Sequence, residues 1–172
     1  EVQSVFNSAF YFKFTPPNSE ELISLINQKF ESENDEKLGW HFNCLVNTLT
    51  LNAENWMRHI IPSLDIFSRE FSYDGGFEVI DPWINSYSYN GFQEIHTHRC
   101  CDMAAVFFVN TGYNFGKFYF YDRLSGLLNP PIEKLIGYND VIYPEVKPGD
   151  IIMFPSNLLH GVKPHKSHEI RK

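Results

Sequence analysis

The sequence has little cysteine and no long apolar run. Its three cysteines are Cys44, Cys100 and Cys101, an odd set with two adjacent members that does not form a disulfide framework. This pattern favours a reducing compartment, so we expect a cytoplasmic protein. No stretch reaches the roughly 18 consecutive apolar residues that a membrane-spanning helix needs, so no membrane segment is expected.

Basic residues are also scarce relative to acidic ones. The 172 residues include 14 Lys or Arg and 21 Asp or Glu, which gives a formal net charge of −7. A surface of this sign argues against general binding to phosphate backbones, so nucleic acid is not an expected partner. The pattern carries no signal for an oligomeric state.

What the chain does have is apolar and aromatic residues in short runs. Apolar residues make up 43% of it and aromatic residues 16%, including 16 Phe and 9 Tyr, a composition that favours packed β-structure. We expect one domain over residues 1–172, with a helical support region at about 1–74 and a jelly-roll core at about 75–172.

Three elements are predicted in the first half. Alternation over Ala9–Thr15 predicts a strand. A helix capped by Asn18 or Ser19 follows, and a second helix begins near Asn52. Pro62 lies inside the second apolar pattern, so a kink or a restart is expected there.

The second half is a series of short strands separated by turn signals. The fold class that this indicates is α+β and mainly β: an antiparallel jelly roll with the helices packed on one face and a last strand that continues past Lys172. The expected strands are Phe77–Ile80, Trp83–Tyr89, Gln93–His98, Met103–Val109, Lys117–Tyr121, Val141–Pro144, Asp150–Phe154 and Leu158–Val162.

Three histidines predict a metal site. His96 and His98 are two residues apart, so on a strand both imidazoles point to one face. Downstream, a turn at 147–150, an apolar strand at 151–155 and His160 form a hairpin that can bring His160 opposite this pair. Imidazole suits iron, zinc, nickel or copper, so ligand type alone does not select the metal. The alternative is a pair of surface histidines on an edge strand.

Arg171 follows His160 by eleven residues and is a candidate carboxylate clamp. A guanidinium can hold a carboxylate through two parallel hydrogen bonds, which a protein that binds only a metal does not need. The alternative is an exposed arginine near a frayed end. His165 and His168 lie in a polar stretch and are expected in a solvated loop.

Several of these segments together resemble a known family. They are His96-Thr97-His98, 104–109, 116–122, and Pro148-Gly149-Asp150 followed by His160-Gly161-Val162 and Arg171. They are similar to the iron(II)- and 2-oxoglutarate-dependent oxygenases, closest to the short members with a His-x-His metal strand found in marine bacteria and phages. The resemblance covers about residues 80–172. It implies a double-stranded β-helix in the cytoplasm of a bacterial cell or phage-infected host.

The resemblance also implies roles for individual residues. His96 matches the first iron ligand, His160 the distal ligand, and Arg171 the residue that holds the far carboxylate of 2-oxoglutarate. His98 stands where the family usually has Asp, and Asp102 is the alternative third ligand.

A second contact to 2-oxoglutarate has to come from elsewhere, because Phe107 and Phe108 lie where prolyl hydroxylase-like members have Tyr. Tyr87, Tyr89 and Tyr119 are the candidates. The implied cofactors are Fe(II) and 2-oxoglutarate, and the implied reaction is hydroxylation of a small molecule or peptide with O2.

Two other functions also fit the sequence. His96, His98, Asp102 and His160 also resemble the four metal ligands of cupins, which would indicate a dioxygenase or isomerase that does not use 2-oxoglutarate. A jelly roll that binds a sugar or a protein without catalysis is the third reading.

Overall fold

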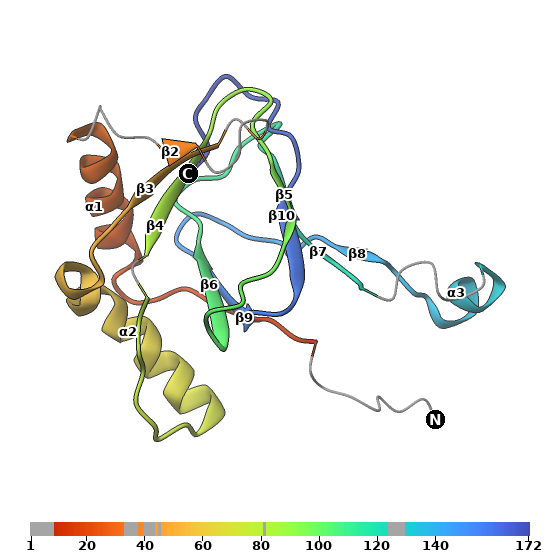
Figure 1. Cartoon of the computed structure of the whole chain (residues 1–172), viewed down its shortest axis with the longest axis horizontal. Coiled ribbons are helices and arrows are strands. Elements are labelled where there is room, and N and C mark those ends of the chain that lie inside the picture. Colours follow the sequence, from red (N-terminus) through yellow and green to blue (C-terminus); the bar gives the residue numbers. More distant parts are fainter. Residues whose placement is uncertain (1–8, 33–37, 40–43, 45, 81, 124–129) are drawn as a thin grey trace.

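The computed structural model describes residues 9–32, 38–39, 44, 46–80, 82–123 and 130–172 (Figure 1). Two helices and three strands precede the remaining strands, in the following order. The elements are β1 (Phe12–Phe14), α1 (Ser19–Ser32), β2 (Leu38–Gly39), β3 (Val46–Thr50), α2 (Ala53–Phe71), β4 (Trp83–Tyr87), β5 (Gln93–His96), β6 (Met103–Phe107), β7 (Phe118–Tyr121), α3 (Pro130–Ile136), β8 (Val141–Ile142), β9 (Ile151–Pro155) and β10 (Leu159–Val162).

The strands pair into three antiparallel sheets, with orders β1-β9-β6, β5-β10-β7-β8 and β2-β3-β4. The first half of the chain therefore supplies strands to two of the sheets, besides the helices that were expected of it. β2 and β3 were not predicted, because their pairing depends on β4, which lies more than thirty residues further along the chain. Sheets shared by both halves support the proposal of one domain.

A short segment around Arg171 joins the two three-stranded sheets. Its backbone makes a bridge to Tyr87 on β4, through N–H···O distances of 2.9 and 3.1 Å. On its other side, the Asn110 amide after β6 donates to the Ile170 carbonyl and accepts from the Lys172 N–H, both at 2.8 Å. Figure 1 shows this end of the chain beside β4. Within the described residues, this segment forms a single bridge, and a strand that continues past Lys172 stays a prediction.

Two apolar cores lie on the opposite faces of β4. Tyr87 belongs to the core enclosed by the sheets, which also contains Phe118, Ile152 and Phe154. Ile84 faces the other way and packs with Ile26 and Leu51 against the helices. Figure 1 shows α1 and α2 together on the side of β3 and β4, with β5 and β10 across the molecule. The helices thus cover one face, as expected.

Helix α2 has the predicted cap at its start and a proline in its interior. The Asn52 side chain caps it by accepting from the Asn55 N–H at 3.0 Å, and Ser72 ends it in a left-handed conformation at φ 48°. The helix runs from Ala53 to Phe71 through Pro62, so of the two expected outcomes the restart does not occur, and a kink at this residue stays a prediction. Proline removes only one backbone donor, and the helix remains continuous because its apolar face, which includes Trp56, packs against the core.

Two other expectations also failed. Residues 77–80 form no strand, and Phe77 instead packs its ring on Phe67 and Tyr73 at centroid distances of 6.0 and 5.1 Å. Helix α3 stands where only a turn signal between two strands was expected, and it begins at Pro130, since a first-turn proline costs no hydrogen bond. No helix among the described residues is long and apolar enough to cross a membrane.

The packing of β9 predicts a large stability difference between two isoleucines. Ile152 lies fully buried at 0% exposure between β1 and β6, whereas Ile142 on β8 is 52% exposed. We expect Ile152→Ala to lower the free energy of unfolding by about 2–5 kcal/mol and Ile142→Ala by less than about 1 kcal/mol. Urea denaturation of both variants measures this, and equal losses would contradict the placement of the core.

Candidate metal centre

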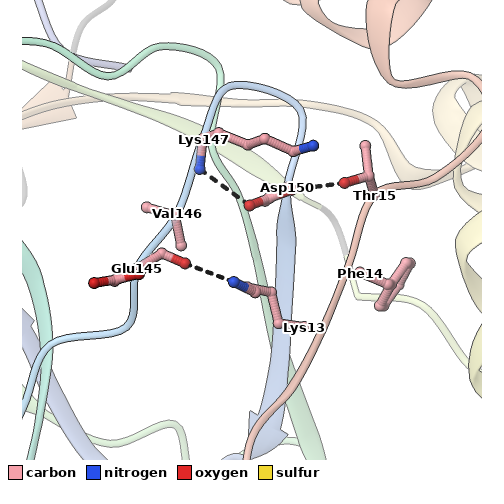
Figure 2. Close-up of a pocket in the computed structure, with 7 residues that line it drawn as sticks. All are labelled: Lys13, Phe14, Thr15, Glu145, Val146, Lys147 and Asp150. Atoms are coloured by element: carbon pink, nitrogen blue, oxygen red, sulfur yellow. Dashed lines mark hydrogen bonds between the residues drawn. The ribbon is translucent and has the colours of Figure 1, made fainter.

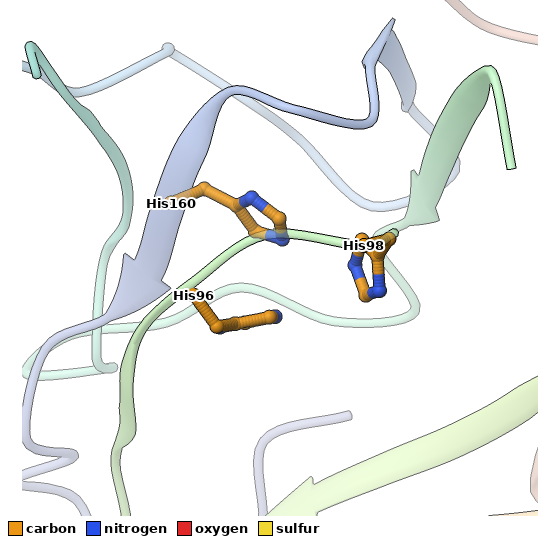
Figure 3. Close-up of side chains that lie close together, drawn as sticks. All are labelled: His96, His98 and His160. Atoms are coloured by element: carbon orange, nitrogen blue, oxygen red, sulfur yellow. The ribbon is translucent and has the colours of Figure 1, made fainter. Parts of the chain in front are cut away.

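The pairing of β10 with β5 places two histidines face to face. His160 on β10 lies directly opposite His96 on β5. The centroids of their rings are 4.2 Å apart, and Figure 3 shows both rings on the same side of the two strands. The hairpin that the sequence indicated thus brings His160 to the position that was expected.

A bulge in β5 determines which side chains share this face. His160 pairs with His96, but Val162 pairs with Gln93, so three residues of β5 span the distance of two on β10. In a regular strand, residues three apart would point to opposite faces. The extra residue turns Gln93 to the same face as His96. Residues 93–96 contain no glycine or turn-forming residue that would predict this bulge.

His98 completes the cluster from just beyond β5. Its N–H donates to the Ser156 carbonyl at 2.9 Å, so the turn between β9 and β10 holds the backbone of this residue in place. The His98 ring lies 5.1 Å from that of His96 and 5.0 Å from that of His160. The candidate ligand atoms of the three residues all lie within 4.8 Å of one another.

Backbone carbonyls orient two of the three rings. Nδ1 of His96 lies 2.8 Å from the Glu94 carbonyl, and Nδ1 of His160 lies 2.8 Å from the Leu158 carbonyl. A carbonyl only accepts, so each Nδ1 carries the proton and donates it. Each Nε2 is then the basic nitrogen, which is how metal-ligating histidines are commonly held.

Burial favours the neutral form of two of the three histidines. Loss of solvent, together with the neighbouring His96 and His98, lowers the pKa of His160 to about 4, against the opposing effect of the bond to Leu158. Burial, and then His96, lowers the pKa of His98. Neutral imidazoles can ligate a metal, whereas protonated ones cannot. His98 and His160 are therefore neutral nitrogen donors near neutral pH.

Two predicted candidates lie away from the cluster. Asp102, the alternative third ligand, has an exposed side chain and does not belong to the group of converging ligand atoms. Tyr119 pairs with Gly161, so it points to the face opposite that of His160. Its ring there lies 4.7 Å from the Lys163 ammonium. Strand alternation therefore excludes Tyr119 from the face of the histidines.

Arg171 and Tyr87 form a second group on the inside of the fold. Arg171 is 6% exposed and Tyr87 is 2% exposed, and the guanidinium carbon lies 4.7 Å from the centre of the Tyr87 ring. Burial lowers the pKa of Arg171 and raises that of Tyr87, and the contact between them opposes both shifts. Arg171 makes no ion pair with an acid among the described residues. Arg171 is therefore not the exposed arginine near a frayed end that was the alternative expectation.

Tyr89, the remaining tyrosine candidate, is 47% exposed and stacks on His168 at 5.1 Å.

One face of β4 connects the two groups. Trp83 and Tyr87 are four residues apart, so they point to the same side of the strand, with their Cα atoms roughly 13 Å apart. The Trp83 ring is tilted against that of His98 at 5.8 Å and is 40% exposed, while Tyr87 contacts Arg171. The histidines and the arginine thus lie at the two ends of one strand face.

His165 has a role that the sequence did not indicate. It was expected in a solvated loop, but it is 0% exposed. Its Nδ1 accepts from the Gly116 N–H at 3.1 Å, and its Nε2 donates to the Glu169 carbonyl at 2.6 Å. A side chain at Gly116 would come within 2.2 Å of the Lys163 carbonyl, so glycine permits this contact. Through these two hydrogen bonds, His165 stabilises the loop that leads to Arg171.

A shallow pocket of about 460 Å³ lies elsewhere, along β1 and the loop before β9 (Figure 2). Several of its polar groups bond to one another: Lys13 donates to the Glu145 carbonyl at 2.8 Å, and Asp150 accepts from the Thr15 hydroxyl at 2.6 Å and the Lys147 N–H at 3.0 Å. These bonds fix the turn before β9. The pocket contains none of the predicted site residues.

Comparison with known proteins gives a family and a fold. A family model described as "Putative 2OG-Fe(II) oxygenase" matches residues 81–172. HygX from Streptomyces hygroscopicus, solved with nickel, 2-oxoglutarate and hygromycin B bound, is similar with a TM-score of 0.69 and 10% identity over 97% of this chain and 81% of that chain. No curated protein matches the sequence.

Two prolyl hydroxylases are similar as well. That of Pseudomonas putida, a prolyl-4-hydroxylase, has a TM-score of 0.64 and 13% identity over 95% of this chain and 89% of that chain. That of Trichoplax adhaerens, in complex with a peptide fragment of the hypoxia inducible factor oxygen degradation domain, has a TM-score of 0.64 and 13% identity over 96% and 81%. At these identities the likeness shows the fold alone, a double-stranded β-helix with additional helices.

The geometry predicts which substitutions abolish metal binding. His160→Ala and His96→Ala each remove one of three converging donors, so neither variant is expected to retain stoichiometric Fe(II). Asp102→Ala and, as a matched histidine control, His168→Ala should retain it, because both side chains are exposed and outside the cluster. Metal analysis after anaerobic loading measures this. Full occupancy in either of the first two variants would refute the ligand assignment.

Proposed function

This chain belongs to the 2OG-Fe(II) oxygenases, and from that premise we propose that His96, His98 and His160 hold its iron. It is an oxidoreductase that depends on iron(II) and 2-oxoglutarate and uses O2 on a substrate. The observation that carries the site assignment is the convergence of three imidazoles with ligand atoms within 4.8 Å of one another.

The donor set fits a divalent transition metal. Three imidazole donors, on β5, just beyond it and on β10, leave one side of a metal open, and imidazole is a suitable ligand for iron. His98 replaces the carboxylate that usually completes such a triad, so this chain contributes no negative charge from its ligands. The exposed position of Asp102 supports this assignment.

The second group of residues fits a dicarboxylic cosubstrate. We propose that Arg171 holds the far carboxylate of 2-oxoglutarate, with Tyr87 beside it. A buried guanidinium is costly unless an anion faces it, and Arg171 has no acidic partner among the described residues. Arg171 contacts Tyr87 at one end of the β4 face, and His98 contacts Trp83 at the other end. This placement supports a ligand that spans from the histidines to Arg171.

The chemistry that iron and 2-oxoglutarate supply when bound is O2 activation, which yields succinate, CO2 and an oxidant for a substrate C–H bond. We propose hydroxylation as the outcome. The chain itself orients the metal ligands through the Glu94 and Leu158 carbonyls and excludes water through the buried residues around His160.

Trp83 is the residue that we propose for contact with the substrate. Its ring is partly exposed and packs against His98, so it borders the metal centre from the solvent side. A small molecule or a peptide is the proposed substrate class. Of the similar structures, one holds hygromycin B and another a peptide fragment.

We propose a reducing, cytoplasmic location because Cys44, Cys100 and Cys101 are all free thiols, and Cys100 is exposed.

The cupin alternative needs a fourth metal ligand, and Asp102, its candidate, is not in the cluster. The geometry therefore favours the oxygenase site.

Anaerobic titration tests the proposed cofactor pair. The chain loaded with Fe(II) is expected to develop a weak visible charge-transfer band when 2-oxoglutarate is added. On admission of O2, it should form succinate. Chelation of the iron should abolish both signals. An iron-loaded chain that shows neither the band nor succinate would contradict the proposed use of 2-oxoglutarate.

Replacement of the clamp residue separates the metal from the cosubstrate. Arg171→Lys is expected to weaken 2-oxoglutarate binding by roughly 1–3 kcal/mol, because a point charge replaces a two-pronged donor. Affinity for Fe(II) alone should stay unchanged. The matched control is Arg69→Lys, at an exposed arginine on α2. Calorimetric titration measures both affinities, and an unchanged affinity for 2-oxoglutarate would place the clamp elsewhere.

A further inference from the structure

Gln93 is a buried amide on the same face as the histidines. It is 6% exposed, and the β5 bulge places it opposite Val162 while His96 lies opposite His160. Since Val162 and His160 are two residues apart on β10, they share a face, and Gln93 shares it with them. Without the bulge, the Gln93 side chain would point away from the interior.

Tyr87 fixes the orientation of this amide. The Tyr87 hydroxyl donates to Oε1 of Gln93 at 2.8 Å, and both side chains are buried. Oε1 therefore faces Tyr87, and the Nε2 donors face another direction. No acceptor for Nε2 occurs among the described residues. Nε2 is not one of the fully enclosed polar atoms that lack a partner, so it borders open space from which a ligand can accept its hydrogen bond.

The guanidinium of Arg171 lies over the ring of the same Tyr87. The guanidinium carbon lies 4.7 Å from the ring centre, so Gln93 and Arg171 contact one tyrosine from two sides. Both side chains offer N–H donors, and neither has an acidic partner among the described residues. A group that accepts from both is an anion with several oxygen atoms, such as a carboxylate.

We propose that Nε2 of Gln93 donates to the far carboxylate of 2-oxoglutarate beside Arg171 and so contributes to selection of a diacid. This inference rests on the proposed function. The amide can serve both contacts, because Oε1 accepts from Tyr87 while Nε2 donates to the anion. A glutamate at this position would present a second negative charge and would itself pair with Arg171.

Two ligands and two glutamine variants test the contact. In the Fe(II)-loaded full chain under anaerobic conditions, Gln93→Met is expected to weaken 2-oxoglutarate binding about 10- to 100-fold. Binding of 2-oxobutanoate, a 2-oxo acid without the far carboxylate, should change less than about twofold. The matched control is Gln28→Met on helix α1, where the amide bonds only to Ser24 and both affinities should stay at the parent values.

Three results of this titration would decide against the contact or against its premise. Unchanged 2-oxoglutarate affinity in Gln93→Met would overturn the inference while leaving the proposed function intact. An equal loss for both ligands would also overturn it, since that indicates a general structural role. Failure of the parent chain to bind 2-oxoglutarate would instead refute the proposed function, and the inference with it.

Gln93→Glu supplies a readout that needs no ligand. A carboxylate at this position can pair with Arg171, so the melting temperature of the metal-free chain is expected to rise. Binding of 2-oxoglutarate should fall by more than about 100-fold, because the clamp is occupied by an internal acid and repels the anion. A lower melting temperature with retained 2-oxoglutarate binding would overturn the inference. If neither variant folds, Gln93 is a structural residue and the inference is wrong.

Discussion

The antiparallel pairing of β10 with β5 is the constraint on which the site depends. It places His160 opposite His96 and, through one extra residue, Gln93 opposite Val162. A shift of one residue in this register would turn each of these side chains to the other face of the sheet. The pairing is supported on its far side by β7, whose Phe118 and Phe120 pack on Phe154 in the core. Core packing thus fixes the register that brings the polar residues together.

Arg171 lies in a segment with a structural role, and the proposed function adds a chemical role for its side chain. The backbone of residues 170–172 closes the gap between β4 and β6: Arg171 bonds to Tyr87, and its two neighbours Ile170 and Lys172 bond to the Asn110 amide. The Arg171 side chain carries a buried positive charge. Because the backbone is held from both sides, the guanidinium needs little further ordering when an anion binds, which lowers the entropic cost of recognition.

Local periodicity was sufficient to predict most of the strands and the histidine cluster. His96 and His98 were readable because strand side chains repeat every two residues, and His160 because its hairpin has a clear turn and an apolar strand. The β5 bulge, the burial of His165 and the strands β2 and β3 were not readable. Each of these depends on partners distant in the sequence: β10, Gly116 and β4. Tyr119 was misassigned for the same reason, since its face is determined by pairing with Gly161.

The distance in sequence between the cluster's members has a consequence for how the protein matures. His96 and His98 are neighbours, so even an unfolded chain can offer them as a two-point chelate. His160 lies about sixty residues further on, and closing a loop of that length costs conformational entropy that only the β5–β10 pairing recovers. With the proposed ligands, tight capture of an ion would follow long-range folding rather than precede it, and the bound ion would stabilise only the chain that has already reached the correct register. With these ligands, retention of the metal would therefore depend on correct pairing of β5 with β10.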